Sequence, residues 1–221
     1  MALTKYNFNS FDVTSAASKA LGFNASANGF ATINPGSMTH IKTLTASSSS
    51  TLSFVDGSSS VVLDNTYPVY LFKFISIHAA TQDKVFQFNM SADTGSNYNV
   101  TKTTTAFYAY HNEAGNDAAL SYTNGSDVAQ STGFAQIGGD ASSTDNDSGM
   151  CGEVYLFNPS STTFVKHFMS RFTLFDYSPY AHDRYIAGYG NTTSAVDAIQ
   201  FKMSSGNIDA GTIKLYGIKD S

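Results

Sequence analysis

Residues 67–91 read YPVYLFKFISIHAATQDKVFQFNMS and carry the strongest strand signal in the chain. In the first half, Tyr70, Phe72 and Phe74 fall on one face of an extended strand, and the other face is largely apolar too. This pattern predicts a central strand that is covered on both faces. In residues 84–91, apolar and polar residues alternate, which predicts a strand with one face in the core.

Strand signals continue on both sides of this stretch. Residues 39–55 predict two short strands around a Ser-rich turn, and the last third of the chain is a succession of apolar runs separated by turns. In residues 211–218, Ile213 and Leu215 alternate with polar residues, which indicates a strand paired inside a sheet, after a hairpin-like connection at 204–211. About ten strands with almost no helix predict an all-β fold, an antiparallel β-sandwich of jelly-roll-like type.

Residues 1–37 differ from the rest and form an N-terminal arm without a sheet pattern, although the Ala-rich stretch 12–21 favours one short helix. The arm has too many apolar residues for a free tail, so we expect it to serve attachment or oligomerisation. Residues 38–221 then form the sandwich domain, with a long loop at about 111–149 and a short element near 118–122. The candidate anchors of the arm are Phe8, Phe11, Phe23 and Phe30.

Composition excludes several classes of protein. Hydrophobic residues make up 42% and aromatic residues 14% of the chain, which is enough for a core, whereas charged residues make up only 13%. The net charge of −5 argues against a nucleic-acid partner, and no apolar run is long enough to cross a membrane. The N-terminus lacks a secretory signal pattern, and Cys151 is the only cysteine, so we expect a buried free thiol and no disulfide framework within the chain.

The sequence contains no recognisable catalytic or metal-binding motif. The five histidines are scattered without a HExxH pair, and no Gly-x-Ser-x-Gly turn is present. We therefore expect no enzyme activity and no cofactor. An acidic group at 140–153 has oxygen ligands at alternate positions but lacks the spacing of an EF-hand, so a solvated loop is favoured over an ion site. Its members are Asp140, Asp145, Asp147 and Glu153.

A Tyr-rich stretch at 176–185 is the main candidate binding patch, and we expect a loop at 176–183 followed by a strand from Arg184. Tyr combines a rigid apolar ring with a polar tip, which suits both protein interfaces and sugars. Three interpretations remain open: a loop that caps the sandwich, a protein interface and a glycan site. The candidate residues are Tyr177, Tyr180, His182, Asp183, Arg184 and Tyr185.

Three segments carry a resemblance to a known group of proteins. They are TYPVYLFKFISIHAATQDKVFQFNMSADTGSNYNVT (66–101), NPSSTTFVKHF (158–168) and NTTSAVDAIQFKMSSGNIDAGTIKLYGI (191–218). These segments resemble small virion structural proteins of tailed bacteriophages, especially marine and cyanobacterial ones, and the resemblance covers roughly residues 51–218. It implies a β-sandwich component of the virion, assembled in the host cytoplasm, and brings no catalytic residues with it.

The expected function is therefore that of a non-enzymatic virion structural protein, either capsid decoration or a head or tail spike component. The expected partners are other virion proteins and further copies of the chain, with a homotrimer favoured by analogy with threefold phage appendages. The alternative is a tail-fibre adhesin that recognises host surface polysaccharide.

Overall fold

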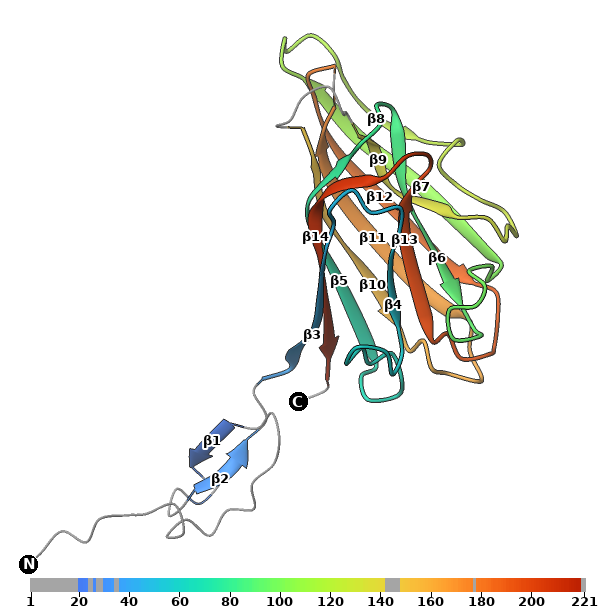
Figure 1. The fold of residues 1–221 in the computed structure, drawn as a ribbon. Helices are drawn as coiled ribbons and strands as arrows, with labels where there is room; N and C mark the ends of the chain where they lie inside the picture. Colours follow the sequence, from blue (N-terminus) through green and yellow to red (C-terminus); the bar gives the residue numbers. More distant parts are fainter. Residues whose placement is uncertain are drawn as a thin grey trace, which may run out of the picture.

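The computed structural model describes residues 20–23, 26, 30–33, 36–141, 148–176 and 178–219 of the chain. Within these residues the protein consists of strands and turns, and the paired strands are antiparallel (Figure 1). The strands are β1 (Ala20–Phe23), β2 (Phe30–Ile33), β3 (Met38–Thr45), β4 (Leu52–Val55), β5 (Val69–Ala79), β6 (Lys84–Ser91), β7 (Lys102–Asn112), β8 (Ala118–Tyr122), β9 (Ala135–Ala141), β10 (Met150–Phe157), β11 (Lys166–Phe175), β12 (Tyr180–Gly190), β13 (Ala198–Met203) and β14 (Ile208–Ile218).

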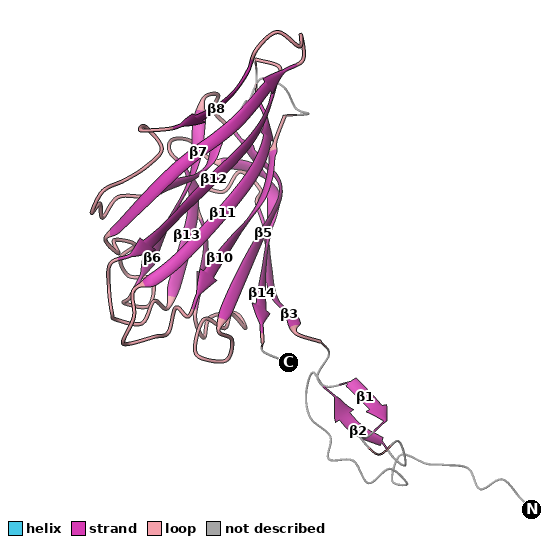
Figure 2. Ribbon diagram, turned by 180° about the vertical axis from the view of Figure 1, so that it is seen from behind, coloured by secondary structure: helices cyan, strands magenta, loops and turns pink. Residues whose placement is uncertain are grey.

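Two sheets form the body of the molecule. The larger has eight strands in the order β3-β14-β5-β10-β11-β12-β7-β8, and the smaller has four in the order β4-β13-β6-β9. Figure 2 shows the larger sheet in front of the smaller one. The expected all-β antiparallel sandwich is confirmed. The jelly-roll assignment stays a prediction, supported by the way β3, β4, β5 and β6 alternate between the two sheets.

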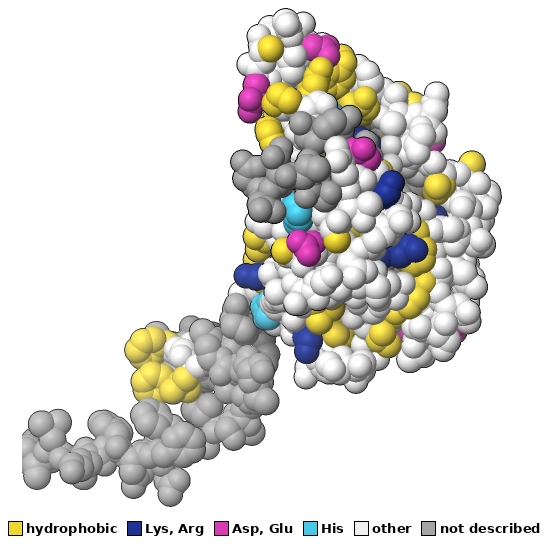
Figure 3. Space-filling model, turned by 45° about the horizontal axis from the view of Figure 1, so that its top comes forward, with side chains coloured by type: hydrophobic (Ala, Val, Ile, Leu, Met, Phe, Trp, Pro, Cys, Tyr) yellow, Lys and Arg dark blue, Asp and Glu magenta, His cyan; other side chains and the backbone are white. Residues whose placement is uncertain are grey.

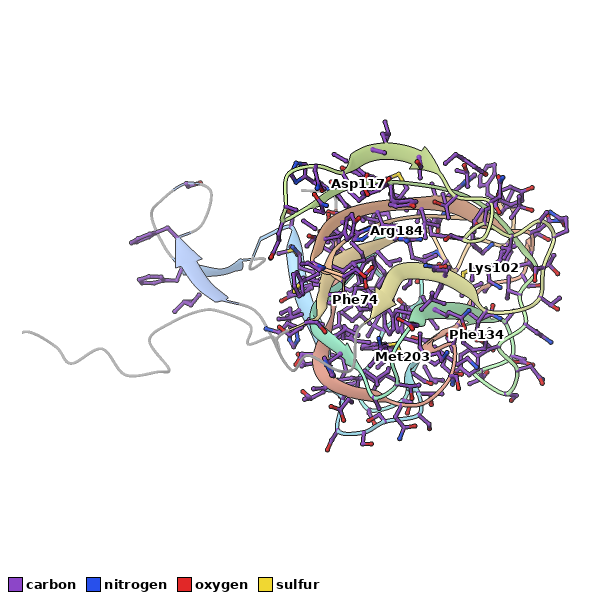
Figure 4. All side chains as sticks on the ribbon, turned by 90° about the horizontal axis from the view of Figure 1, so that it is seen from above. Phe74, Lys102, Asp117, Phe134, Arg184 and Met203 are labelled. Carbon is purple, nitrogen blue, oxygen red and sulfur yellow. The ribbon has the colours of Figure 1, made fainter. Side chains whose placement is uncertain are left out.

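Aromatic rings fill the space between the sheets. Phe74 of β5 lies 5.0 Å from Phe172 of β11, 5.0 Å from Phe201 of β13 and 5.5 Å from Phe86 of β6, measured between ring centroids. All four side chains are buried. In Figure 4, Phe74 and Met203 lie between the two layers. Fully burying each ring contributes about 1.5–3 kcal/mol, so this cluster is the centre of the core.

β5 is central, as predicted, but the expectation that both its faces are covered is wrong. Lys73 is exposed and Ile75 is 44% exposed, because nothing among the described residues packs on the outer face of the larger sheet there. At Ser76 the backbone has a φ of 51°, and the strand alternation shifts so that Ile77 turns into the core. The partner strand shifts register at Gly211, whose φ is +117°.

The C-terminal strand lies inside the larger sheet, as predicted. β14 pairs with β3 on one side and with β5 on the other. The hairpin-like connection expected before it is wrong, because β13 belongs to the smaller sheet and β14 to the larger one. The connection therefore crosses from one layer of the sandwich to the other, and the local Gly pattern of residues 204–211 does not distinguish a crossing from a hairpin.

Two regions that were expected to be an irregular arm and a long loop carry strands. In the arm, β1 and β2 form a hairpin in which the Phe23 and Phe30 rings stack 5.2 Å apart. The range 111–149, expected to be a long loop, contains β8, which coincides with the short element expected near 118–122, and β9, which was not expected and completes the smaller sheet. Phe8, Phe11 and most of the proposed helix at 12–21 lie outside the described residues.

Candidate functional site

The Tyr-rich stretch is a strand from its fifth residue onward, which corrects the expected loop at 176–183. β12 begins at Tyr180, so successive side chains point to opposite faces of the larger sheet. His182 and Arg184 lie on the inner side, which faces the smaller sheet, and Asp183 and Tyr185 lie on the outer side. The six predicted residues therefore do not form one patch, and Tyr177 lies outside the described residues.

On the outer face, Asp183 and Tyr185 belong to a ladder of paired side chains. The Arg171 guanidinium donates two hydrogen bonds to the Asp183 carboxylate, at 3.0 and 2.8 Å, and lies 5.1 Å from the centre of the Tyr185 ring. These hydrogen bonds hold the pKa of Asp183 below its ordinary value and raise the pKa of Arg171. Tyr185 stacks on Phe107 of β7 with 4.9 Å between ring centroids.

Apolar side chains and shallow hollows mark the same outer face. Met169 is 50% exposed beside an open hollow of about 550 Å³ that Phe157 and Tyr189 also line. A second hollow of about 570 Å³ lies between Ile75 and Arg171. An uncovered sheet face with exposed apolar and aromatic side chains has the chemistry of a protein contact surface.

On the inner side, the larger sheet extends past the smaller one and leaves an aromatic cluster at its edge. β9 packs against β10, β11 and β12, and the larger sheet continues beyond it as β7 and β8. Tyr110 pairs with His182 in the β7–β12 register, and Tyr108 stacks on both, at 5.7 Å from each ring. Tyr180 lies edge-on to Tyr110 at 5.6 Å. We call these four rings, together with Asp117, the tyrosine ledge.

Asp117 joins the ledge from the position directly before β8. It accepts a hydrogen bond of 2.8 Å from the Tyr180 hydroxyl. This bond raises the pKa of Tyr180, and the nearby Asp117 charge raises the pKa of Tyr110. The ledge lines an open hollow of about 290 Å³, to which Asp176 contributes a second carboxylate, 3.6 Å from Nε2 of His182.

Arg184, buried behind the ledge, supports it from the core side. Its guanidinium lies 4.9 Å from the Tyr108 ring centre, and Nη1 donates a hydrogen bond of 2.8 Å to Ser126. Figure 4 places Arg184 beneath the sheet and Asp117 near the outlying strand β8. Sequence reasoning missed Tyr108, Tyr110 and Asp117. The alternating YAY at 108–110 was a signal for two rings on one face, but the pairing of β7 with β12 is not visible in the sequence.

The arm anchors that the structure describes are exposed. Phe23 is 69% and Phe30 41% exposed, and Leu21 of the same hairpin, which was not among the predicted anchors, is 55% exposed. Figure 3 shows these hydrophobic side chains gathered on the hairpin, apart from the sandwich. The described anchors are therefore not packed into the core of their own domain.

Outside the ledge, Cys151, His78 and Asp209 line one open hollow of about 400 Å³. Cys151 is exposed, which corrects the expected buried thiol, and its Sγ accepts a hydrogen bond from the Ser76 amide at 3.3 Å. His78 lies 3.5 Å from the Asp209 carboxylate. Across the described ranges, no three His, Cys, Asp or Glu side chains are placed to hold a metal ion. Asp145 and Asp147 of the acidic group lie outside those ranges.

The described residues also include no helix that is long and apolar enough to cross a membrane. The fold and its surfaces define an all-β sandwich protein with an appended hairpin, an uncovered outer sheet face and an aromatic ledge. No family model matches the chain, and no curated protein or solved structure matches it either.

Proposed function

We propose that the protein is a non-enzymatic structural component of a bacteriophage virion, a capsid decoration or a head or tail spike protein. The observation that carries the proposal is the exposed β1–β2 hairpin at the N-terminal side of the sandwich, with Leu21, Phe23 and Phe30 on its surface. Together with the resemblance of residues 51–218 to phage virion proteins, it supports a role in assembly.

The energetics of the hairpin support a partner. An isolated two-stranded hairpin is at best marginally stable in water. Phe23 is 69% and Phe30 41% exposed, so burying the rest of both rings would contribute about 2–3 kcal/mol in total, given about 1.5–3 kcal/mol for each fully buried ring. This gain is available only against another surface, which we propose to be a neighbouring copy or another virion protein.

The outer face of the larger sheet offers the second half of such an assembly. Its exposed Met169, Ile75 and Phe107 side chains suit contact with another copy of the chain. We propose a homo-oligomer, with a trimer as the favoured state by analogy with threefold phage appendages.

The test uses particles from host cells that carry this gene. An antibody against the sandwich domain should label purified particles in electron micrographs, and mass spectrometry should detect the chain at constant copy number. Particles that carry Phe23→Ser and Phe30→Ser should hold less of the protein, while the exposed sandwich variant Phe164→Ser should not change its copy number. Absence of the chain from purified wild-type particles would overturn the proposal.

A second candidate function is a tail-fibre adhesin for host surface glycans. It is favoured by one observation, the tyrosine ledge, which combines aromatic rings with a carboxylate in an open hollow.

A further inference from the structure

The tyrosine ledge is a preorganised surface, because its rings stand on paired strands rather than on loops. Tyr108 and Tyr110 lie on β7, and Tyr180 and His182 lie on β12, the neighbouring strand in the larger sheet. The ring contacts of 5.6–5.7 Å fix Tyr110 against Tyr108 and Tyr180. Side chains held by strand pairing and by one another lose little conformational freedom when a ligand binds.

The polar groups of the ledge are placed at the rim of the rings. The Tyr180 hydroxyl donates to Asp117 Oδ2 at 2.8 Å, and because a carboxylate offers about four lone-pair sites, Asp117 can also accept from a ligand. The carboxylate raises the pKa of both Tyr110 and Tyr180 above the ordinary value, so these phenols remain hydrogen-bond donors. The surface therefore offers apolar ring faces beside hydrogen-bond donors and acceptors.

The charges of the ledge select against anionic ligands. Asp117 and Asp176 both line the hollow. The cation behind them, Arg184, is buried and engaged with Ser126 and Tyr108, so its charge is not presented to the solvent. Figure 3 shows acidic and hydrophobic side chains close together at the end of the sandwich that comes forward in that view.

The size of the hollow limits the ligand. Its volume of about 290 Å³ lies at the lower end of the range for small-molecule sites, about 300–1,000 Å³. One or two sugar rings fit such a space. A pyranose also matches the chemistry, because its C–H face packs on aromatic rings and its hydroxyls both donate and accept hydrogen bonds.

We propose that the tyrosine ledge binds a neutral saccharide, with one sugar face on the tyrosine rings and sugar hydroxyls on Asp117 and the Tyr hydroxyls. The inference rests on the geometry of the ledge alone and goes beyond the structural role, so it holds whether or not the chain belongs to a virion. The open hollow favours weak binding at each site, with a dissociation constant of about 1 mM, which several copies on one particle would strengthen.

The experiment titrates the purified full chain with the methyl glycosides of glucose, galactose, mannose and N-acetylglucosamine, followed by isothermal calorimetry and saturation-transfer NMR. Methyl glucuronide is the anionic comparison. We expect at least one neutral glycoside to bind and the glucuronide to bind at least tenfold more weakly. Asp117→Asn should weaken binding about tenfold, the equivalent of about 1.4 kcal/mol.

A matched control exists on the same sheet. Tyr122 donates a hydrogen bond of 2.7 Å to Asp127, an exposed tyrosine–carboxylate pair outside the ledge, so Asp127→Asn should leave binding unchanged. Tyr110→Ala, checked for folding by circular dichroism, should abolish binding. The proposal is overturned if no neutral glycoside binds the wild-type chain at tens of millimolar. It is equally overturned if binding survives both ledge variants. Incorporation into particles is measured separately, so failure here leaves the virion role standing.

Discussion

Lys102 gives a quantitative test of the core, because its side chain is fully buried at the start of β7. Its ammonium group donates hydrogen bonds to the carbonyls of Val100, at 3.0 Å, and Gly133, at 2.6 Å. Figure 4 labels the position of Lys102 in the sandwich. Burial disfavours the charged form and lowers the pKa of Lys102 from 10.5 to about 8.

The sign of the pH dependence follows from this depressed pKa. The folded protein releases the Lys102 proton near pH 8, and the unfolded chain releases it near pH 10.5. Between these values the unfolded state binds more protons, so the free energy of unfolding rises with pH. A pKa difference of one between the two states is worth about 1.36 kcal/mol, so Lys102 should add about 2–3 kcal/mol between pH 7 and pH 10.

The assay is urea unfolding at a series of pH values for the wild-type chain, Lys102→Met and the control Lys84→Met. Met keeps the unbranched stem but does not titrate. The wild-type free energy of unfolding should rise relative to that of Lys102→Met by about 2–3 kcal/mol between pH 7 and pH 10. Lys166, whose pKa burial also lowers, contributes equally to both proteins and cancels. Parallel curves for wild type and Lys102→Met would refute the reasoning.

Three further changes test the packing. Phe172→Ala removes a ring 5.0 Å from Phe74 and should lower the free energy of unfolding by about 3–5 kcal/mol, measured in urea. Gly211→Ala should cost at least about 2 kcal/mol, because its φ is +117° and a Cβ would lie 2.6 Å from the Ser76 carbonyl oxygen. Deleting residues 211–221 should leave the protein in the insoluble fraction, because two strands lose their shared partner.

Control substitutions show whether these losses of stability come from the stated contacts or from any change of a Phe or Gly. Phe164→Ala removes a ring that is largely exposed and should change the free energy of unfolding by no more than about 0.5 kcal/mol. Gly115→Ala also has a positive φ but nothing near its Cβ position, so it should cost less than Gly211→Ala. A soluble, folded protein without residues 211–221 would contradict the assignment of β14 to the sheet interior.

The sequence predicts strands well where one face is buried, because alternation depends only on neighbouring residues. β11 shows this plainly: Phe168 and Phe172 are buried, while His167, Met169 and Arg171 between and beside them are exposed. The same local period made the sandwich predictable. It says nothing about which strand lies alongside, and therefore nothing about which outward side chains meet.

The candidate site depended on that missing information. Tyr110 and His182 are neighbours only because β7 pairs with β12, across about seventy residues of sequence. The sequence groups residues 180–185 into one patch that begins in a loop, because consecutive polar and aromatic residues are typical of a turn. In an extended strand the same six residues divide between two faces, and each face then recruits partners from β7 or β11.

The arm and the tyrosine ledge lie at opposite ends of the sandwich. One molecule can therefore attach to a particle through the arm and bind a sugar at the ledge. Met38 and Ile218 pair at the end where the arm joins β3, whereas Asn112 and Tyr180 pair at the other end, beside the ledge. Figure 1 shows the hairpin and the C-terminus at the opposite end from the turn between β7 and β8. An eleven-residue strand such as β7 spans about 35 Å, so attachment through the arm would leave the ledge clear of the particle surface. Binding a sugar and joining an assembly therefore do not compete for the same residues.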